Sequence, residues 1–212
     1  MGKEEKIVTK IEEFDKKRYK IYLDQEFAFV LYKGEVARYQ IFLNQNIEEE
    51  IYRKITQEVL VKRAQKRCLN LLQKKNYTEY KLREKLKEGG YSEEVEEIAI
   101  EYVKSYGYID DYRYAEEYVF FHKSKESLKK IEDKLKKKGI SSDILDQVFA
   151  DSYEDGEAEN VEMQQAIKLL QKKQYDEDNM DWKEKQKIYM FLLRKGIRSS
   201  IVKKAMSLKD FV

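Results

Sequence analysis

Three stretches of the chain repeat one pattern, and this pattern decides the fold. They read Leu82-x3-Leu86-x3-Gly90 followed by Tyr91-Ser92-Glu93-Glu94-Val95, Ile131-x3-Leu135-x3-Gly139 followed by Ile140-Ser141-Ser142-Asp143-Ile144, and Ile188-x3-Leu192-x3-Gly196 followed by Ile197-Arg198-Ser199-Ser200-Ile201. The copies align without gaps, and their glycines are 49 and then 57 residues apart. Repetition at this period is typical of stacked helical units.

Each copy predicts a helix, a glycine turn and a second helix. Two apolar residues four positions apart lie on one helix face. The glycine supplies the left-handed exit, and the apolar residue after it folds back onto the helix. Ser92, Ser142 and Ser199 stand where the next helix should begin. A further helix is expected before each copy, at Ala64–Lys74, Tyr112–Lys123 and Val161–Lys173. Three-helix units cannot bury their apolar faces alone, so we expect them to stack as an elongated, curved solenoid.

The composition favours the same fold class, which is mainly α. The 212 residues include no proline and only 8 glycines, and both residues disfavour helix interiors. Hydrophobic residues make up 42% of the chain, enough for a core, and charged residues make up 40%. We therefore expect helices with heavily charged outer faces.

The N-terminal segment has a different pattern, which predicts a small antiparallel β segment. The run from Tyr19 to Leu23 alternates in polarity, and after Gln25-Glu26 comes the apolar run Phe27–Leu31, so the two runs predict a hairpin. Ile7–Ile11 and Val36–Leu43 are candidates for further strands. From about Asn46 the period changes to that of a helix.

These patterns predict four segments. Residues 1–45 form the β-rich segment, and 46–106 form the first helical repeat with its leading helix. Residues 107–153 form the second three-helix repeat, and 154–212 form the third.

The net charge of +2 predicts little, but its distribution is uneven. Phe121–Ile140 carries eight lysines against three acids, and Lys183–Lys209 carries nine basic residues against Glu184 alone. Asp151–Glu162, between them, carries six acids and no base. Basic blocks suit a polyanion or an acidic protein surface, although a solvated helix face is the simpler interpretation of any single block. The candidate contacts are Lys129, Lys130, Lys134, Lys136, Lys137, Lys138, Arg194, Lys195, Arg198, Lys203 and Lys204.

No catalytic or metal-binding constellation is visible. The phosphate-binding loop, the dinucleotide fingerprint, the nucleophile elbow and zinc-ligand spacings are all missing, and His122 is the lone histidine. Asp110 and Asp111 are adjacent, so we expect a helix cap and a first-turn acid, with Tyr108 and Ile109 packing behind them. The sequence therefore predicts a binding protein that uses no metal, cofactor or small-molecule substrate.

Cysteine usage and hydropathy predict a cytoplasmic protein without a membrane span. Cys68 is the only cysteine, and its apolar helical register indicates a buried structural thiol. The N-terminus, Met1–Lys10, is polar and charged rather than typical of a signal peptide, and no run approaches the roughly 20 apolar residues of a membrane helix.

The order and spacing of these motifs resemble those of the RecX family. The most similar stretch is Tyr106–Ala115, YGYIDDYRYA, which resembles the family's G-[YF]-[LI]-D-D-x-x-[FY]-A segment. Arg63-Ala64, Leu82–Leu86 and Leu135–Ile140 are also similar to family segments, so the resemblance covers roughly residues 60 to 206. By this resemblance the structural residues are Gly90, Tyr108, Asp110, Asp111, Tyr114, Ala115, Gly139 and Gly196.

The resemblance implies tandem three-helix repeats and a non-enzymatic regulator that binds the RecA filament. Its expected effect is inhibition of recombinase and co-protease activity, in DNA repair and the SOS response. The basic patches would face an acidic or nucleoprotein groove. Two other hypotheses stay open: direct binding to single- or double-stranded DNA without RecA, and a scaffold for another protein.

Overall fold

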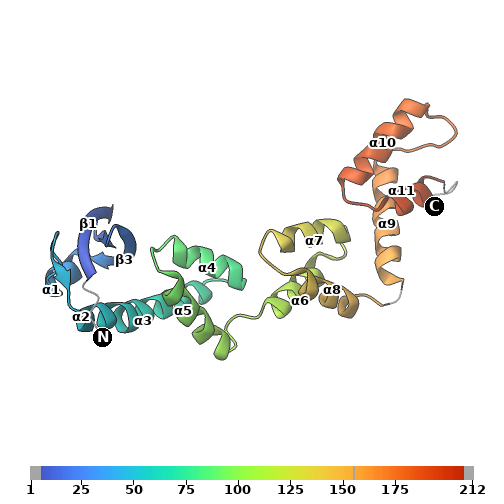
Figure 1. Ribbon diagram of the computed structural model, residues 1–212. Helices are drawn as coiled ribbons and strands as arrows, with labels where there is room; N and C mark the ends of the chain where they lie inside the picture. The colour runs from blue at the N-terminus through green and yellow to red at the C-terminus, as the bar shows by residue number, and fades with distance from the viewer. Residues whose placement is uncertain (1–5, 155, 208–212) are drawn as a thin grey trace. The chain divides into compact units, whose positions relative to one another are not determined.

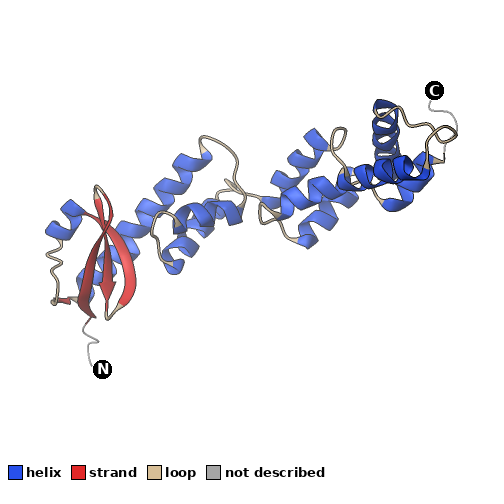
Figure 2. Cartoon of the chain, turned by 90° about the horizontal axis from the view of Figure 1, so that it is seen from above, coloured by secondary structure: helices blue, strands red, loops and turns tan. Residues whose placement is uncertain are grey.

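The computed structural model describes residues 6–154 and 156–207. Asp155 of the acidic stretch and Lys209 of the second basic block lie outside the described residues. The chain divides into two compact units, one ending at Asp110 and the other beginning at Asp111. The strands belong to the first unit, and the described part of the second unit contains helices, turns and loops (Figure 2).

A four-stranded antiparallel sheet opens the first unit, in the order β3-β2-β1-β4. Ile21 pairs with Ile11 and with Phe29, and Ile21, Phe29 and Leu31 are fully buried. The predicted hairpin is confirmed. Its strands are β1 (Lys6–Asp15), β2 (Arg18–Leu23), β3 (Glu26–Tyr32) and β4 (Asn46–Ile47).

The β2–β3 turn lies one residue earlier than the polar pair suggested. It uses Asp24 and Gln25, with φ of 49° and 73°, and this pair of left-handed residues matches the twist of a two-residue hairpin loop. The prediction of a strand at Val36–Leu43 was wrong, because helix α1 (Lys33–Arg38) covers its first residues and a turn and loop follow. A Glu35 carboxylate oxygen accepts a 2.8 Å hydrogen bond from the Tyr32 amide, which closes the first turn of that helix.

The first repeat follows the sheet (Figure 1). The leading helix begins at Glu49 rather than near Asn46, and Ile47 belongs to β4. The Thr78 hydroxyl accepts a hydrogen bond from the Lys81 amide, as expected of a helix cap. The helical elements are α2 (Glu49–Arg53), the π-helical segment η1 (Lys54–Leu60), α3 (Val61–Leu72), α4 (Glu79–Lys87) and α5 (Glu93–Ser105).

The sheet and the first repeat share one continuous apolar core. Ile21 and Phe29 of the sheet belong to the same buried cluster as Ala64, Leu82 and Ile100 of the helices. Cys68 also lies in this core and is fully buried. Burial raises the pKa of the Cys68 thiol to about 11, which suits the structural role expected of it.

The second unit contains two three-helix repeats with separate cores. Ile131 and Leu135 are fully buried in the core of the second repeat, and Leu192 in that of the third. Fold class is thus confirmed as mainly α with a small N-terminal antiparallel sheet. The helices are α6 (Asp111–His122), α7 (Leu128–Lys136), α8 (Ser142–Ser152), α9 (Glu157–Lys172), α10 (Trp182–Arg194) and α11 (Ser199–Met206).

The glycines of the repeat occupy equivalent turns. Gly90, Gly139 and Gly196 have φ of 78°, 85° and 87°, the left-handed conformation predicted for a helix exit. A Cβ on Gly90 would collide with Val30 of the sheet, and one on Gly196 would collide with the Ser127 hydroxyl. At these two turns the glycine is required both by its backbone angle and by its close neighbour.

The family-like stretch Tyr106–Ala115 joins the two units. Helix α6 begins at Asp111, Ala115 is fully buried and Tyr114 is half-buried against the second core. Ile109 packs in the first core as expected. Tyr108 does not: its side chain is 54% exposed and stacks on Tyr106, because an exposed neighbouring ring offers it apolar contact outside the core.

Candidate functional site

Helix α7 and the turn after it carry the basic residues predicted in the second repeat, and some of them are neutralised. Lys134 pairs with Glu126 at 2.6 Å, and Lys136 pairs with Glu132 at 2.5 Å. The Lys138 ammonium lies over the Tyr114 ring, 5.5 Å from its centroid. Within the described part of the chain, no ion pair engages Lys129, Lys130 or Lys137.

The basic residues of the third repeat divide in the same way. Lys204 pairs with Glu159 at 3.3 Å, and the Lys195 ammonium lies 5.3 Å from the centroid of the Phe191 ring. Arg194 and Lys203 are exposed, and among residues 156–207 neither forms an ion pair.

Arg198 has a structural contact that its sequence context does not reveal. Its amide and its Nε each donate a 2.5 Å hydrogen bond to the carboxylate of Glu162, whose side chain is only 2% exposed. Because a buried carboxylate without partners is costly, this pair holds α9 to the start of α11. Arg198 is therefore less available to a partner than Arg194.

Polar contacts join the second repeat to the third. The Ser127 hydroxyl, at the start of α7, donates a 2.9 Å hydrogen bond to the Lys195 carbonyl oxygen in the turn after α10. The Gln165 amide, on α9, donates to the carbonyl oxygens of Lys123 and Glu126, both at 3.1 Å. These bonds bring the start of α7 against α9 and the glycine turn of the third repeat.

This junction contains a cavity of about 280 Å³ that is open to solvent and has a basic lining. It brings together Lys130 and Lys195, which the sequence predicted separately. It adds Lys125, which lies inside the first basic block, and Lys168, for which the sequence held no signal. The rest of the lining is Ser124, Glu126, Ser127, Gln165, Leu169 and Ile197.

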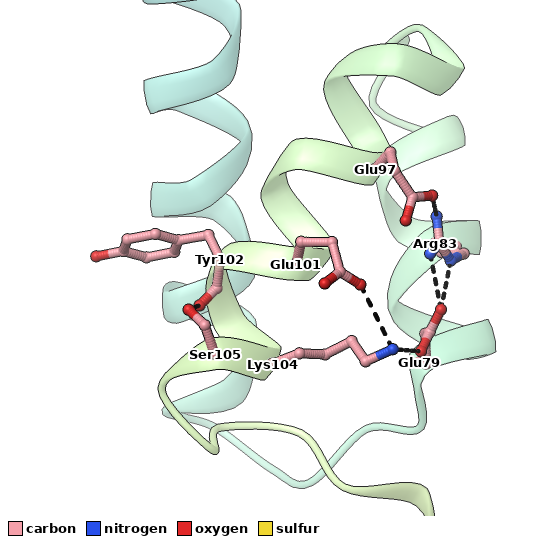
Figure 3. A network of polar contacts seen from close by, with 7 residues as sticks. All are labelled: Glu79, Arg83, Glu97, Glu101, Tyr102, Lys104 and Ser105. Atoms are coloured by element: carbon pink, nitrogen blue, oxygen red, sulfur yellow. Dashed lines mark hydrogen bonds and ion pairs between the residues drawn. The ribbon is translucent and has the colours of Figure 1, made fainter.

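Opposite charges cancel in one cluster of the first repeat, between α4 and α5. Figure 3 shows Arg83 between Glu79 and Glu97, at 2.7 and 2.8 Å, and Lys104 between Glu79 and Glu101, at 3.0 and 3.5 Å. Burial by itself would raise the pKa of Glu79, but hydrogen bonds from Arg83 and Lys104 outweigh it and hold this pKa below its ordinary value. Arg83 and Lys104 therefore offer a partner little unpaired positive charge.

The described residues hold neither a metal-binding cluster nor a helix that could span a membrane. Residues 6–154 and 156–207 contain no group of three or more histidine, cysteine, aspartate or glutamate side chains that could hold a metal ion. Over the same residues, every helix is too short or too polar to cross a membrane.

Comparisons with known proteins agree with this architecture. Residues 64–102 match the sequence profile described as RecX, first three-helix domain, and residues 160–206 match that described as RecX, third three-helix domain. The chain is 31% identical over 206 residues to Regulatory protein RecX of Clostridium acetobutylicum, covering 91% of each chain. It is 27% identical over 212 residues to Regulatory protein RecX of Clostridium botulinum strain Alaska E43, covering 96% of this chain and 98% of the relative.

A solved structure gives the same result. The fold superposes on a crystal structure of regulatory protein RecX with a TM-score of 0.60 at 25% sequence identity. The match covers 94% of this chain and 99% of that one.

Proposed function

Because the chain belongs to the RecX family of regulatory proteins, we propose that it binds the RecA filament and inhibits its recombinase and co-protease activities. We also propose that it acts without catalysis and in the cytoplasm. The observation that carries the binding proposal is the set of exposed basic side chains without ion pairs on the second and third repeats, chiefly Lys129, Lys137, Arg194 and Lys203.

The physical basis is a set of weak contacts that act together. An exposed charge contributes little by itself, because water and salt screen it. Several such charges held by folded helices add through effective concentration once the first contact forms. A filament offers many copies of the same surface, so the gain is larger for an assembled filament than for an isolated RecA molecule.

The test is inhibition of the DNA-dependent ATP hydrolysis of RecA by the purified chain. We expect inhibition at substoichiometric amounts, because one bound molecule would restrain several neighbouring subunits. No inhibition at stoichiometric amounts would count decisively against the proposal.

A variant pair locates the surface. We expect Arg194→Glu with Lys203→Glu to weaken inhibition about 10-fold, since charge reversal at an interface replaces attraction by repulsion. Lys62→Glu with Lys66→Glu, at two exposed positions on α3 of the first repeat, makes the same change of charge as a matched control outside the proposed surface. Arg198 is left intact because it holds Glu162. Equal inhibition by both folded variants would remove Arg194 and Lys203 from the proposed surface.

The same basic side chains favour a second candidate, direct binding to DNA without RecA. This candidate predicts tight binding to naked DNA with strong salt dependence, because each phosphate contact releases counterions. The first proposal predicts weak binding to naked DNA and saturable binding to assembled filaments. Measuring both affinities at two salt concentrations distinguishes the candidates.

A further inference from the structure

We propose that the cavity between the second and third repeats binds a phosphate group of a nucleic-acid backbone. This proposal deepens the proposed function, because a RecA filament contains nucleic acid as well as protein. It rests on the proposed function only for this biological setting. The site combines Lys125 and Lys130 from the second repeat with Lys168 and Lys195 from the third.

The charge of the cavity lining is strongly positive. Four lysines line it, of which Lys195 also has its ammonium over the Phe191 ring outside the lining, and the only acidic side chain among the lining residues is Glu126. Both carboxylate oxygens of Glu126 accept hydrogen bonds from Lys134, at 2.7 and 2.6 Å, and Lys134 is not part of the lining. Glu126 is thus neutralised from outside the cavity. In the described residues, the four lining lysines form no ion pairs with acids, so their mutual repulsion favours a bound anion.

The start of α7 adds to this positive potential. Ser127 stands at the N-cap of α7, but its hydroxyl donates to the Lys195 carbonyl oxygen and makes no capping hydrogen bond within its own helix. The first-turn amides of a helix have no partners inside it, and the helix dipole places partial positive charge there. Ser127 and Lys130, from this turn, both line the cavity, so an anion bound there would meet the helix end as well as the lysines.

The other lining residues favour a phosphate over a base. A volume of about 280 Å³ exceeds that of one phosphate and leaves room for an attached sugar. The apolar lining consists of Leu169 and Ile197, and none of the lining residues is aromatic. Bases in single-stranded nucleic acids are held by stacking on aromatic rings, whereas backbone phosphates are held by lysine and arginine. We therefore infer recognition of the backbone that is independent of base sequence.

The first experiment uses inorganic phosphate and the full chain. In a phosphate titration at constant ionic strength, we expect the backbone amide resonances of Ser127–Lys130 and Lys195–Ile197 to shift, with chloride as the reference. Absence of shifts in both segments would overturn the proposal. An equal response to a polyglutamate peptide at matched charge would also overturn it, because the cavity would then accept acidic groups without preference for phosphate.

The second experiment uses a fluorescent oligo(dT) and the anisotropy of its complex. We expect Lys125→Gln with Lys168→Gln to weaken binding about 5-fold at low salt and to reduce the slope of log K against log salt by about 0.7, the loss of one phosphate contact on a single strand. Glutamine keeps most of the side-chain length, and neither lysine is ion-paired among the described residues. The matched control is Lys183→Gln with Lys187→Gln, which lie outside the cavity; we expect a change of less than 2-fold.

Each other outcome overturns a defined part of the inference. Equal weakening by the two variant pairs would indicate diffuse attraction rather than a site. Resonance shifts with phosphate but no binding of oligo(dT) would indicate a site for free phosphate and exclude the nucleic-acid backbone. None of these measurements contains RecA, so their failure is distinguishable from failure of the proposed inhibition, which the ATP-hydrolysis assay tests alone.

Discussion

The first and third repeats use the same glycine turn to dock onto different neighbours. Gly90 approaches Val30 of the sheet, Arg18 of the sheet donates to the Gly89 carbonyl oxygen beside it, and the sheet and the first repeat also share one apolar core. Gly196 approaches Ser127 of the second repeat, across a junction of polar contacts between two separate cores. Polar contacts cross both junctions, but a shared apolar core excludes water from the first, whereas the second lies between two separate cores and leaves space and charge. The cavity lies at the polar junction.

The largest effects are expected at these two glycines. We expect Gly90→Ala and Gly196→Ala each to lower the free energy of unfolding of their repeat by about 3 kcal/mol, because a Cβ adds a collision to a left-handed backbone. Gly107 also has a positive φ, 67°, but a Cβ there meets no atom within 4 Å. Gly107→Ala is thus the matched control, with an expected cost of about 1 kcal/mol.

Hydrogen exchange resolved by segment measures these costs, because it reports each repeat separately. We expect Gly90→Ala to speed exchange in α3–α5 and Gly196→Ala to speed exchange in α9–α11. If Gly107→Ala lowered the free energy of unfolding as much as the other two substitutions, the backbone conformation, and not the contact with the neighbouring residue, would account for the loss of stability.

A smaller effect is expected at the polar junction. Gln165→Ala removes two hydrogen bonds to carbonyl oxygens of the second repeat, which water can partly replace, so we expect a loss of about 1 kcal/mol in the stability of α9. The neighbouring Gln164 is exposed, and Gln164→Ala provides the same change of side chain without the junction. Identical exchange rates in the two variants would show that Gln165 does not hold the repeats together.

The smallest effect is expected in the first repeat, at the buried residue Glu96. Glu96, on α5, is 1% exposed, and its Oε1 has no hydrogen-bond partner in the part of the chain that the structure describes. Burial raises the pKa of this carboxyl above its ordinary value. Protonation is therefore easier in the folded state, so the first unit loses stability as the pH rises from about 4.5 through the raised pKa.

Replacing Glu96 with glutamine removes this pH dependence. We expect Glu96→Gln to raise the free energy of unfolding by about 0.5 kcal/mol at pH 7 and to have little effect at pH 4, with hydrogen exchange of α5 as the measurement. Glu94→Gln, at an exposed position in the same helix, is the control. A gain that does not change between pH 4 and pH 7 would contradict a titrating carboxyl as its cause.

Local sequence patterns predicted some features of the fold and of the candidate site, but not others. The left-handed turns at Gly90, Gly139 and Gly196 follow from residue type and spacing. The exposure of Tyr108 was not predicted, because a sequence motif does not determine which neighbouring side chain an aromatic ring packs against. Arg198 belonged to a basic block by sequence, yet its partner Glu162 lies 36 residues away in the chain.

The sequence by itself determined the helical repeats, their glycine turns and the two basic blocks, because periodicity, capping and glycine conformation act over a few neighbouring residues. Only the tertiary structure decided which charges cancel and which converge. Lys168 meets Lys130 through the docking of α9 on the second repeat, held by Gln165 and Ser127. Electrostatic interaction depends on distance in space, and residues far apart in the chain acquire that distance only when the repeats pack.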